Sequence, residues 1–248
     1  MDGLWFVLLI SLLPGAGNFA GGMIAEFTKS SPRVLNWALH AASGIVIAIV
    51  AVELIPEARR ALEDSWIAVA FSAGGFSYLL LQSLTERLQR VGGGKSRTGM
   101  WMIYVAVAVD LTSDGLMIGS GSAASVSLAI VLASGQILAD LPEGYAAVAN
   151  FRSKGVARRN RFLLSASFFL FVMMAALLSY LVLRDASEFV KMAALMIAAG
   201  LLTVAALEDM LAEAHEAIED NRRSVIAFIC GFALFTFMSS GIESLLTG

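Results

Sequence analysis

The chain has 248 residues, of which 58% are hydrophobic and 15% are charged, and its mean hydropathy is +0.78. Soluble domains carry about 25% charged residues, so the composition excludes an ordinary soluble domain and predicts an integral membrane protein without a nucleic-acid partner. The net charge is −3, and the single cysteine, Cys230, excludes a disulfide or a thiolate metal cluster within one chain.

Eight apolar runs follow one another, at about 4–25, 34–56, 66–86, 99–120, 126–149, 161–183, 189–211 and 224–246. Each run has the length of about 20 residues that a helix needs to cross a bilayer. None shows the period-two alternation of a membrane barrel. The first run lacks a positive leading segment and a small-residue cleavage site, so we expect a retained helix. These runs predict an all-α protein with eight transmembrane helices in a single domain, residues 1–248.

The basic residues gather in alternate loops. If the amino terminus lies outside, the inner side holds Lys29, Arg33, Arg87, Arg90, Lys95, Arg97, Arg152, Lys154, Arg158, Arg159, Arg161, Arg222 and Arg223. The outer side then holds Arg59, Arg60, Arg184 and Lys191. Because positively charged loops stay in the cytoplasm during insertion, we expect a cell (inner) membrane with both termini outside.

The second and seventh runs share a pattern, a glycine followed by acidic residues nine and thirteen positions later. The residues are Gly44, Glu53 and Glu57 in the second run and Gly200, Asp209 and Glu213 in the seventh. The two runs cross the membrane in opposite directions, as inverted repeats of transporters do. We therefore expect helices one to three and six to eight to be inverted repeats around helices four and five. A chance match among alanine-rich helices is the alternative.

Four acidic residues lie in the middle of the fourth and fifth runs: Asp110, Asp114, Asp140 and Glu143. A charged carboxylate at the bilayer centre costs about 3 kcal/mol, so such residues usually face a cavity or a partner. Spacings of four and three residues place each pair on one helix face. Four adjacent carboxylates need protons, a basic residue or a cation between them, and these runs contain no Lys or Arg. The pattern predicts a cation site; polar contacts that join two helices are the alternative.

Other residues in and beside these runs are weaker candidates. Pro142 removes a backbone hydrogen bond, so we expect an opened helix beside Asp140 and Glu143. Glu53 and Glu57 lie near the predicted outer face and indicate an entrance. The predicted exit comprises His40, Glu208, Asp209, Glu213 and His215 near the inner face. Ordinary solvated side chains at helix ends are the alternative for the histidines and this acidic end.

Four segments resemble the ZIP (Zrt-/Irt-like protein) family of divalent metal transporters. They are "HAASGIVIAIVAVELIPEA" at 40–58, "DLTSDGLMIG" at 110–119, "DLPEGYAAVANFRSKG" at 140–155 and "AAGLLTVAALEDMLAEA" at 198–214. The resemblance implies eight helices with both termini outside, and a travelling metal held by helices four and five, often in two sites that share acids. It implies that Asp114 and Glu143 stand at the shared positions. Asp110 then replaces the first histidine of helix four, and Asp140 stands beside the helix-five ligand.

Departures from the family pattern indicate the ion. Leu111 stands where asparagine is usual, and Ala139 where histidine or glutamine is usual. What remains is an all-oxygen site, which suits harder ions than zinc, such as Mn²⁺, Mg²⁺ or Ca²⁺. We expect one principal site and a transporter that moves divalent cations (Zn²⁺, Mn²⁺, Fe²⁺ or similar) into the cytoplasm by alternating access. No organic cofactor is expected, and a homodimer is left open.

Two other functions stay open. A degenerate relative could bind or sense metal without transport, because usual ligands are missing. An intramembrane hydrolase could use two aspartates as acid and base, although the chain lacks the "GxGD" and "HExxH" patterns of membrane proteases. We expect a protein that is not an enzyme.

Overall fold

The computed structural model describes residues 2–28, 31–91, 95–217 and 221–247. Lys29 and residues 92–94 lie outside these ranges. Within them, eight helical runs are long and apolar enough to span a membrane, and no strand occurs. The predicted all-α membrane fold is therefore confirmed.

Each predicted span corresponds to one helical run. In chain order the elements are α1 (Asp2–Ile10), α2 (Leu12–Phe27), α3 (Pro32–Ala48), the π-helical segment η1 (Ile49–Leu54), α4 (Ile55–Ala58), α5 (Asp64–Val91), α6 (Lys95–Ala124), α7 (Val126–Ser153), α8 (Arg158–Leu183), α9 (Glu188–Ala205), the π-helical segment η2 (Ala206–Met210), α10 (Leu211–Ala217) and α11 (Arg222–Thr247). α1 with α2 forms the first span, α3 to α4 the second, and α9 to α10 the seventh. Most helices extend a few residues beyond the predicted apolar runs.

The expected opening at Pro142 is wrong, because α7 continues through this residue from Val126 to Ser153. A membrane helix tolerates one missing backbone hydrogen bond where neighbouring helices shield it from lipid. Pro142 is buried against such neighbours. The acids of α7 therefore lie on a continuous helix, which fixes their spacing.

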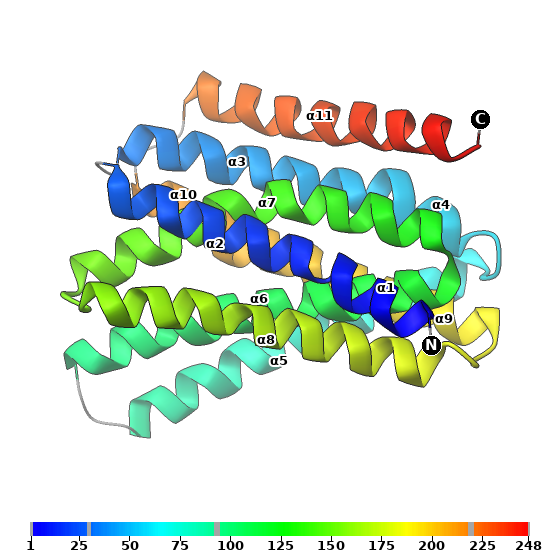
Figure 1. Cartoon of the computed structure of the whole chain (residues 1–248), viewed down its shortest axis with the longest axis horizontal. Coiled ribbons are helices and arrows are strands. Elements are labelled where there is room, and N and C mark those ends of the chain that lie inside the picture. The colour runs from blue at the N-terminus through cyan, green and yellow to red at the C-terminus, as the bar shows by residue number, and fades with distance from the viewer. Residues whose placement is uncertain (1, 29–30, 92–94, 218–220, 248) are drawn as a thin grey trace.

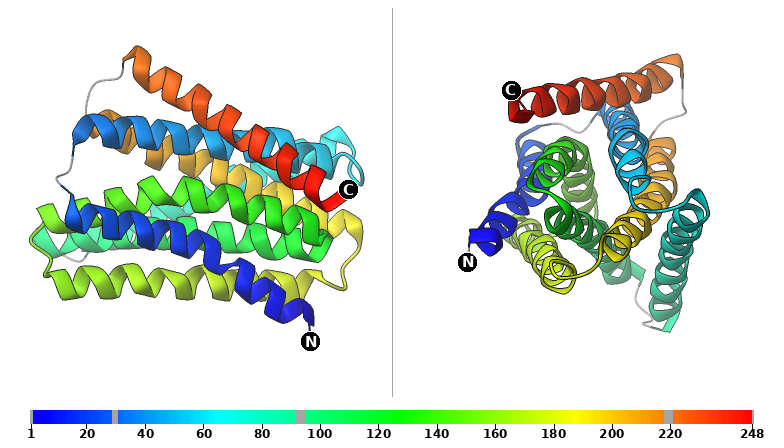
Figure 2. Two further views of the ribbon diagram at one scale, coloured as in Figure 1. Left: turned by 45° about the horizontal axis from the view of Figure 1, so that its top comes forward. Right: turned by 90° about the vertical axis from the view of Figure 1, so that its right-hand side faces the viewer.

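The helices form close pairs through glycines. Viewed along the helices (Figure 2, right), α6 and α7 lie inside the bundle. α7 packs mainly on α2, α6 on α8, α3 on α11 and α5 on α9. A Cβ atom at Gly144 would lie 1.8 Å from the carbonyl oxygen of Asn18, and one at Gly115 would lie 2.4 Å from that of Val172. Small residues allow membrane helices to approach in this way.

The pairing is compatible with the predicted inverted repeat. An inverted repeat relates spans one, two and three to spans six, seven and eight, and span four to span five. Exchanging the related spans converts the α2/α7 pair into α8/α6 and the α3/α11 pair into α9/α5. Gly44 faces the carbonyl oxygen of Phe228 at a Cβ distance of 2.1 Å, and Gly200 faces that of Phe71 at 1.9 Å. The segments η1 and η2 occupy matching places in α3–α4 and α9–α10. The two glycines of the sequence pattern thus make equivalent contacts.

The two ends of the bundle differ in which connections they hold. α1 begins and α11 ends at one end, which also holds the connection between α8 and α9 (Figure 1). α2 ends and α3 begins at the opposite end, which also holds the connection from α7 to α8 (Figure 1). The basic residues of the 152–161 loop therefore lie at the end away from the termini.

Candidate metal centre

Three carboxylates meet between α6 and α7 in the middle of the bundle. Asp110 and Asp114 lie one turn apart on α6, and Asp140 faces them from α7. One oxygen from each residue lies within 4.8 Å of the oxygens from the other two. Their exposed fractions are 5%, 0% and 0%. The structure thus brings together three of the four acids that the spacing singles out.

Glu143, the fourth acid, lies at the edge of this cluster. Its side chain is half-buried and lines the same cavity as Asp110. Asn18 of α2 donates a hydrogen bond from Nδ2 to Oε2 of Glu143 at 3.4 Å. The close contact between Gly144 and the backbone of Asn18 places these two side chains next to each other.

Two amide side chains belong to the centre and are absent from the sequence-based candidates. Asn18 and Gln136 are each 1% exposed. The Nε2 group of Gln136 donates a hydrogen bond to Oδ1 of Asp114. Gln136 lies four residues before Asp140 and seven before Glu143, which places all three on one face of α7. That spacing could have identified Gln136 from the sequence. The only sequence signal for Asn18 is that it is a polar residue within an apolar run.

The centre contains buried oxygens without hydrogen-bond donors. Among the described residues, none donates to Oδ2 of Asp114, to either carboxylate oxygen of Asp140, or to the amide oxygens of Asn18 and Gln136. Buried acceptors that lack a donor cost free energy. Because a divalent cation or protons would satisfy them, the arrangement suits cation binding.

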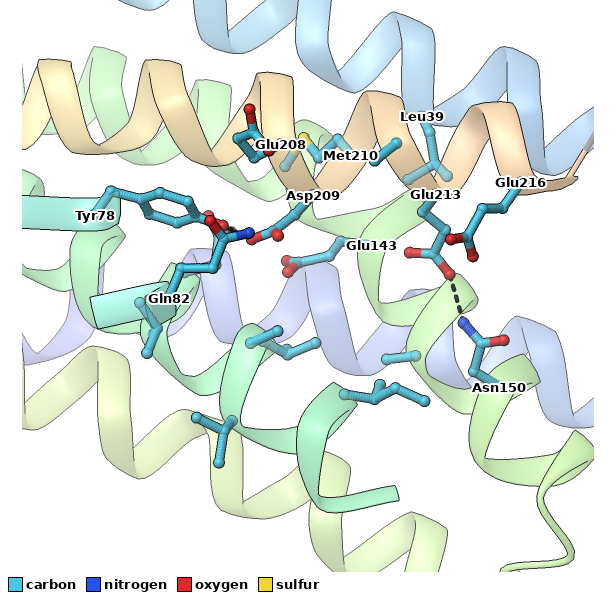
Figure 3. A pocket seen from close by; sticks show the side chains of 18 of the residues that line it. Leu39, Tyr78, Gln82, Glu143, Asn150, Glu208, Asp209, Met210, Glu213 and Glu216 are labelled. Atoms are coloured by element: carbon cyan, nitrogen blue, oxygen red, sulfur yellow. Dashed lines mark hydrogen bonds between the residues drawn. The ribbon is translucent and has the colours of Figure 1, made fainter. Parts of the chain in front are cut away.

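A cavity of about 450 Å³ leads away from Asp110 and Glu143 (Figure 3). It is bounded by α3, α5, α6, α7, η2 and α10, and its lining includes Tyr78, Gln82, Asp110, Glu143, Asn150, Lys154, Glu208, Asp209, Glu213 and Glu216. Tyr78 donates to Asp209, and Asn150 donates from Nδ2 to Oε1 of Glu213 at 2.5 Å. The far end of the cavity, near Lys154, lies beside the basic 152–161 loop. A polar path therefore connects the central acids with that end of the bundle.

The predicted exit residues divide into two groups. Glu208, Asp209 and Glu213 line the cavity. His40 and His215 are not among its lining residues; their rings pack edge to face with centroids 6.0 Å apart. The three acids thus line the cavity, while the rings of the two histidines pack against each other.

The predicted entrance residues lie in the other half of the bundle. Glu53 is 8% exposed and accepts a hydrogen bond from Ser239 of α11. Glu57 pairs with Arg60 at 2.7 Å. Phe235 is fully buried, and a Cβ atom at Gly135 would lie 2.6 Å from its ring. This half is packed at Phe235, whereas the half around Asp209 is open.

These features define an all-α integral membrane protein with a buried acidic centre that opens toward one end. A search of family models finds no match. Over 88 residues, the chain is 34% identical to the zinc transporter ZupT of Akkermansia muciniphila. That alignment covers 32% of this chain and 33% of ZupT, so it spans about a third of the relative's length.

Proposed function

We propose that this chain, residues 1–248, is a ZIP-type transporter that carries divalent metal cations into the cytoplasm. The observation that carries the proposal is the buried cluster of Asp110, Asp114 and Asp140, which an open cavity reaches at Asp110. The partial similarity to a zinc transporter supports it. The cargo is zinc or a harder ion such as manganese or iron.

Carboxylate oxygens suit a site that must bind and then release its ion. Three buried acids and Glu143 offset the charge of a dehydrated cation. The membrane span of α6, residues 103–124, contains no Lys or Arg that would compete with the cation. Thiolate sites hold zinc strongly enough to drive the folding of small domains. Oxygen ligands bind more weakly, which permits turnover.

The grouping of the helices supports alternating access as the mechanism. α2, α6, α7 and α8 form one group, and α3, α5, α9 and α11 form the other; most of the close glycine contacts lie within a group, and Gly135 of α7 packs on Phe235 of α11 between them. We propose that the groups rock against each other around the central acids, as in carriers built from inverted repeats. The structure then corresponds to the state open toward Asp209 and closed at Phe235.

The direction of transport rests on the charge distribution. The open cavity ends near the basic 152–161 loop, which the positive-inside rule assigns to the cytoplasm. Ions then enter past Glu53 and Glu57, bind at the central acids, and leave along Asp209 and Glu213. An acidic lining raises the local concentration of cations.

Uptake of Mn²⁺ and Zn²⁺ into proteoliposomes tests the proposal. Asp114→Ala and Glu143→Ala should each abolish uptake of both ions. Asp185→Ala is the control, because its side chain is 86% exposed at a helix end and should leave uptake unchanged. Uptake that persists in both central variants would remove the assigned role of these acids.

A metal-binding or sensing protein without transport is the second candidate. Leu111 and Ala139, which replace usual ligands of the ZIP family, are each 0% exposed and contribute no donor atom. Elemental analysis of the same proteoliposome protein separates the two functions. Bound metal with no uptake in the unmodified chain favours the sensor, whereas uptake that depends on Asp114 favours the transporter.

A further inference from the structure

The amide groups of Asn18 and Gln136 contact the acidic cluster from two helices. Each amide directs its NH₂ group at one carboxylate, Asn18 at Glu143 and Gln136 at Asp114. Each amide oxygen is buried and accepts no hydrogen bond from a described residue. An amide carries donors and an acceptor in one plane, so the acceptor side of each group is unused.

Packing fixes both amides beside the cluster. Asn18 lies at a point of close approach between α2 and α7, where a Cβ atom at Gly144 would be 2.5 Å from its carbonyl carbon. Gln136 lies one turn before Asp140 on α7 and is 1% exposed. Neither side chain can turn toward water or lipid. The unused oxygens therefore stay buried beside the acids, without access to water.

We propose that Asn18 and Gln136 are ligands of the transported cation, through their amide oxygens. The inference rests on the proposed function, because it assumes that the central acids hold the cargo. When the ion enters, a half-turn of each amide group exchanges its NH₂ for its oxygen. The carboxylates that accepted those NH₂ groups then turn their oxygens to the ion.

The resulting site contains six side chains with oxygen donors: Asn18, Asp110, Asp114, Gln136, Asp140 and Glu143. Six oxygens in an octahedron are typical of Mn²⁺ and Mg²⁺, whereas Zn²⁺ prefers four ligands and accepts nitrogen readily. Amide oxygens complete the coordination without adding negative charge to four carboxylates. The site should therefore favour Mn²⁺ over Zn²⁺ more strongly than the acids alone would.

Metal binding to the purified full-length protein tests this assignment directly. Asn18→Ala and Gln136→Met each remove one amide oxygen, and Gln136→Met keeps a side chain of similar length. Loss of a partner around a metal site typically weakens affinity by about 10- to 100-fold. We expect Mn²⁺ affinity, measured by electron paramagnetic resonance, to fall by at least about 10-fold. Zn²⁺ affinity, measured by competition, should fall much less.

A second pair of variants gives a signal that a structural role cannot produce. Asn18→His and Gln136→His place a ring nitrogen where the amide oxygen lies. Electron spin-echo spectroscopy should then detect a nitrogen bound directly to Mn²⁺, and relative Zn²⁺ affinity should rise. Ala20→His and Leu141→His are the controls, because these side chains are exposed on the same two helices and should show no bound nitrogen.

The outcomes separate this inference from the proposed function. Loss of uptake in Asp114→Ala, together with unchanged Mn²⁺ affinity and no bound nitrogen in the Asn18 and Gln136 variants, would overturn the inference alone. Equal losses of Mn²⁺ and Zn²⁺ affinity without a nitrogen signal would assign both amides a structural role and would also overturn it. Mn²⁺ binding that depends on both amides, in a chain that transports nothing, would support the ligands and overturn the proposed function.

Discussion

Gly144 of α7 lies directly against the carbonyl oxygen of Asn18 in α2, so that a Cβ atom at residue 144 would come within 1.8 Å of that oxygen. Neither backbone can move aside without separating the two helices. Glu143 precedes this glycine, and its carboxylate accepts the amide of Asn18 at 3.4 Å. The position of one central acid therefore depends on a contact that only glycine permits.

Gly144→Ala should separate α2 from α7 and lower both stability and metal uptake. Overpacking in a close interface costs about 1–3 kcal/mol, and the displaced Glu143 loses contact with Asn18. Thermal unfolding in detergent and uptake into proteoliposomes provide the two measurements. The control is Gly241→Ala, where a Cβ atom meets nothing within 4 Å. A Gly144→Ala protein as stable and active as the control would contradict this account of the contact.

Ser239→Ala should destabilise the packed half of the bundle. Glu53 is buried and accepts a hydrogen bond from this hydroxyl, and an unsatisfied buried group costs about 1–3 kcal/mol. Ser239→Thr keeps the hydroxyl and should retain most of the stability. The neighbouring Ser240 is exposed, so Ser240→Ala should change the unfolding temperature little. Similar unfolding temperatures for Ser239→Ala and Ser240→Ala would show that the Glu53 contact contributes nothing.

Arg161→Met should cost more stability than Arg59→Met. Arg161 donates to both oxygens of Glu26, and the two side chains are 11% and 7% exposed. Hydrogen bonds to charged groups contribute about 1.5–3 kcal/mol. Arg59 pairs with Asp64 at 3.0 Å with exposed fractions of 61% and 76%, where a pair contributes less than about 1 kcal/mol. Thermal unfolding of both variants in the same detergent tests this order, and equal losses would contradict it.

Cysteine labelling should reveal which end of the bundle faces the cytoplasm. In a Cys230→Ser background, Ser153→Cys and Ser187→Cys place single thiols on exposed residues, one at the C-terminal end of α7 and one in the α8–α9 connection. The positive-inside rule predicts that a membrane-impermeant reagent added to intact cells labels residue 187 and spares residue 153. Permeabilised cells, in which both should react, provide the control. The opposite labelling pattern would reverse the proposed direction of transport.

The helical spans were largely predictable from the sequence, because bilayer thickness sets a required apolar length. The run predicted at 126–149 is α7, Val126–Ser153, and the run predicted at 161–183 is α8, Arg158–Leu183. The helices run past the apolar segments because backbone hydrogen bonding continues into the polar boundary. The segments η1 and η2 were not predictable, because a π-helical turn changes local hydrogen bonding without changing composition.

The centre was predictable only where one helix supplies the geometry. Asp110 and Asp114 share a face of α6 by their spacing, and the same rule applied one turn earlier on α7 would have included Gln136. Asn18 joins Glu143 across 125 residues of sequence. That contact depends on how α2 and α7 pair, which no local pattern encodes. The continuous course of α7 through Pro142 likewise depends on its neighbours.

Phe235 and Tyr78 lie at matching places in the two halves, each seven residues after the phenylalanine whose carbonyl oxygen faces the patterned glycine. On the packed side the ring is the hydrocarbon ring of Phe235. On the open side it is the phenol of Tyr78, which donates a hydrogen bond to Asp209. Water and protons cross hydrocarbon poorly, since nothing there can hydrogen-bond them. Phe235 thus closes the Glu53 side of the centre with a ring that offers water and protons no hydrogen-bonding group.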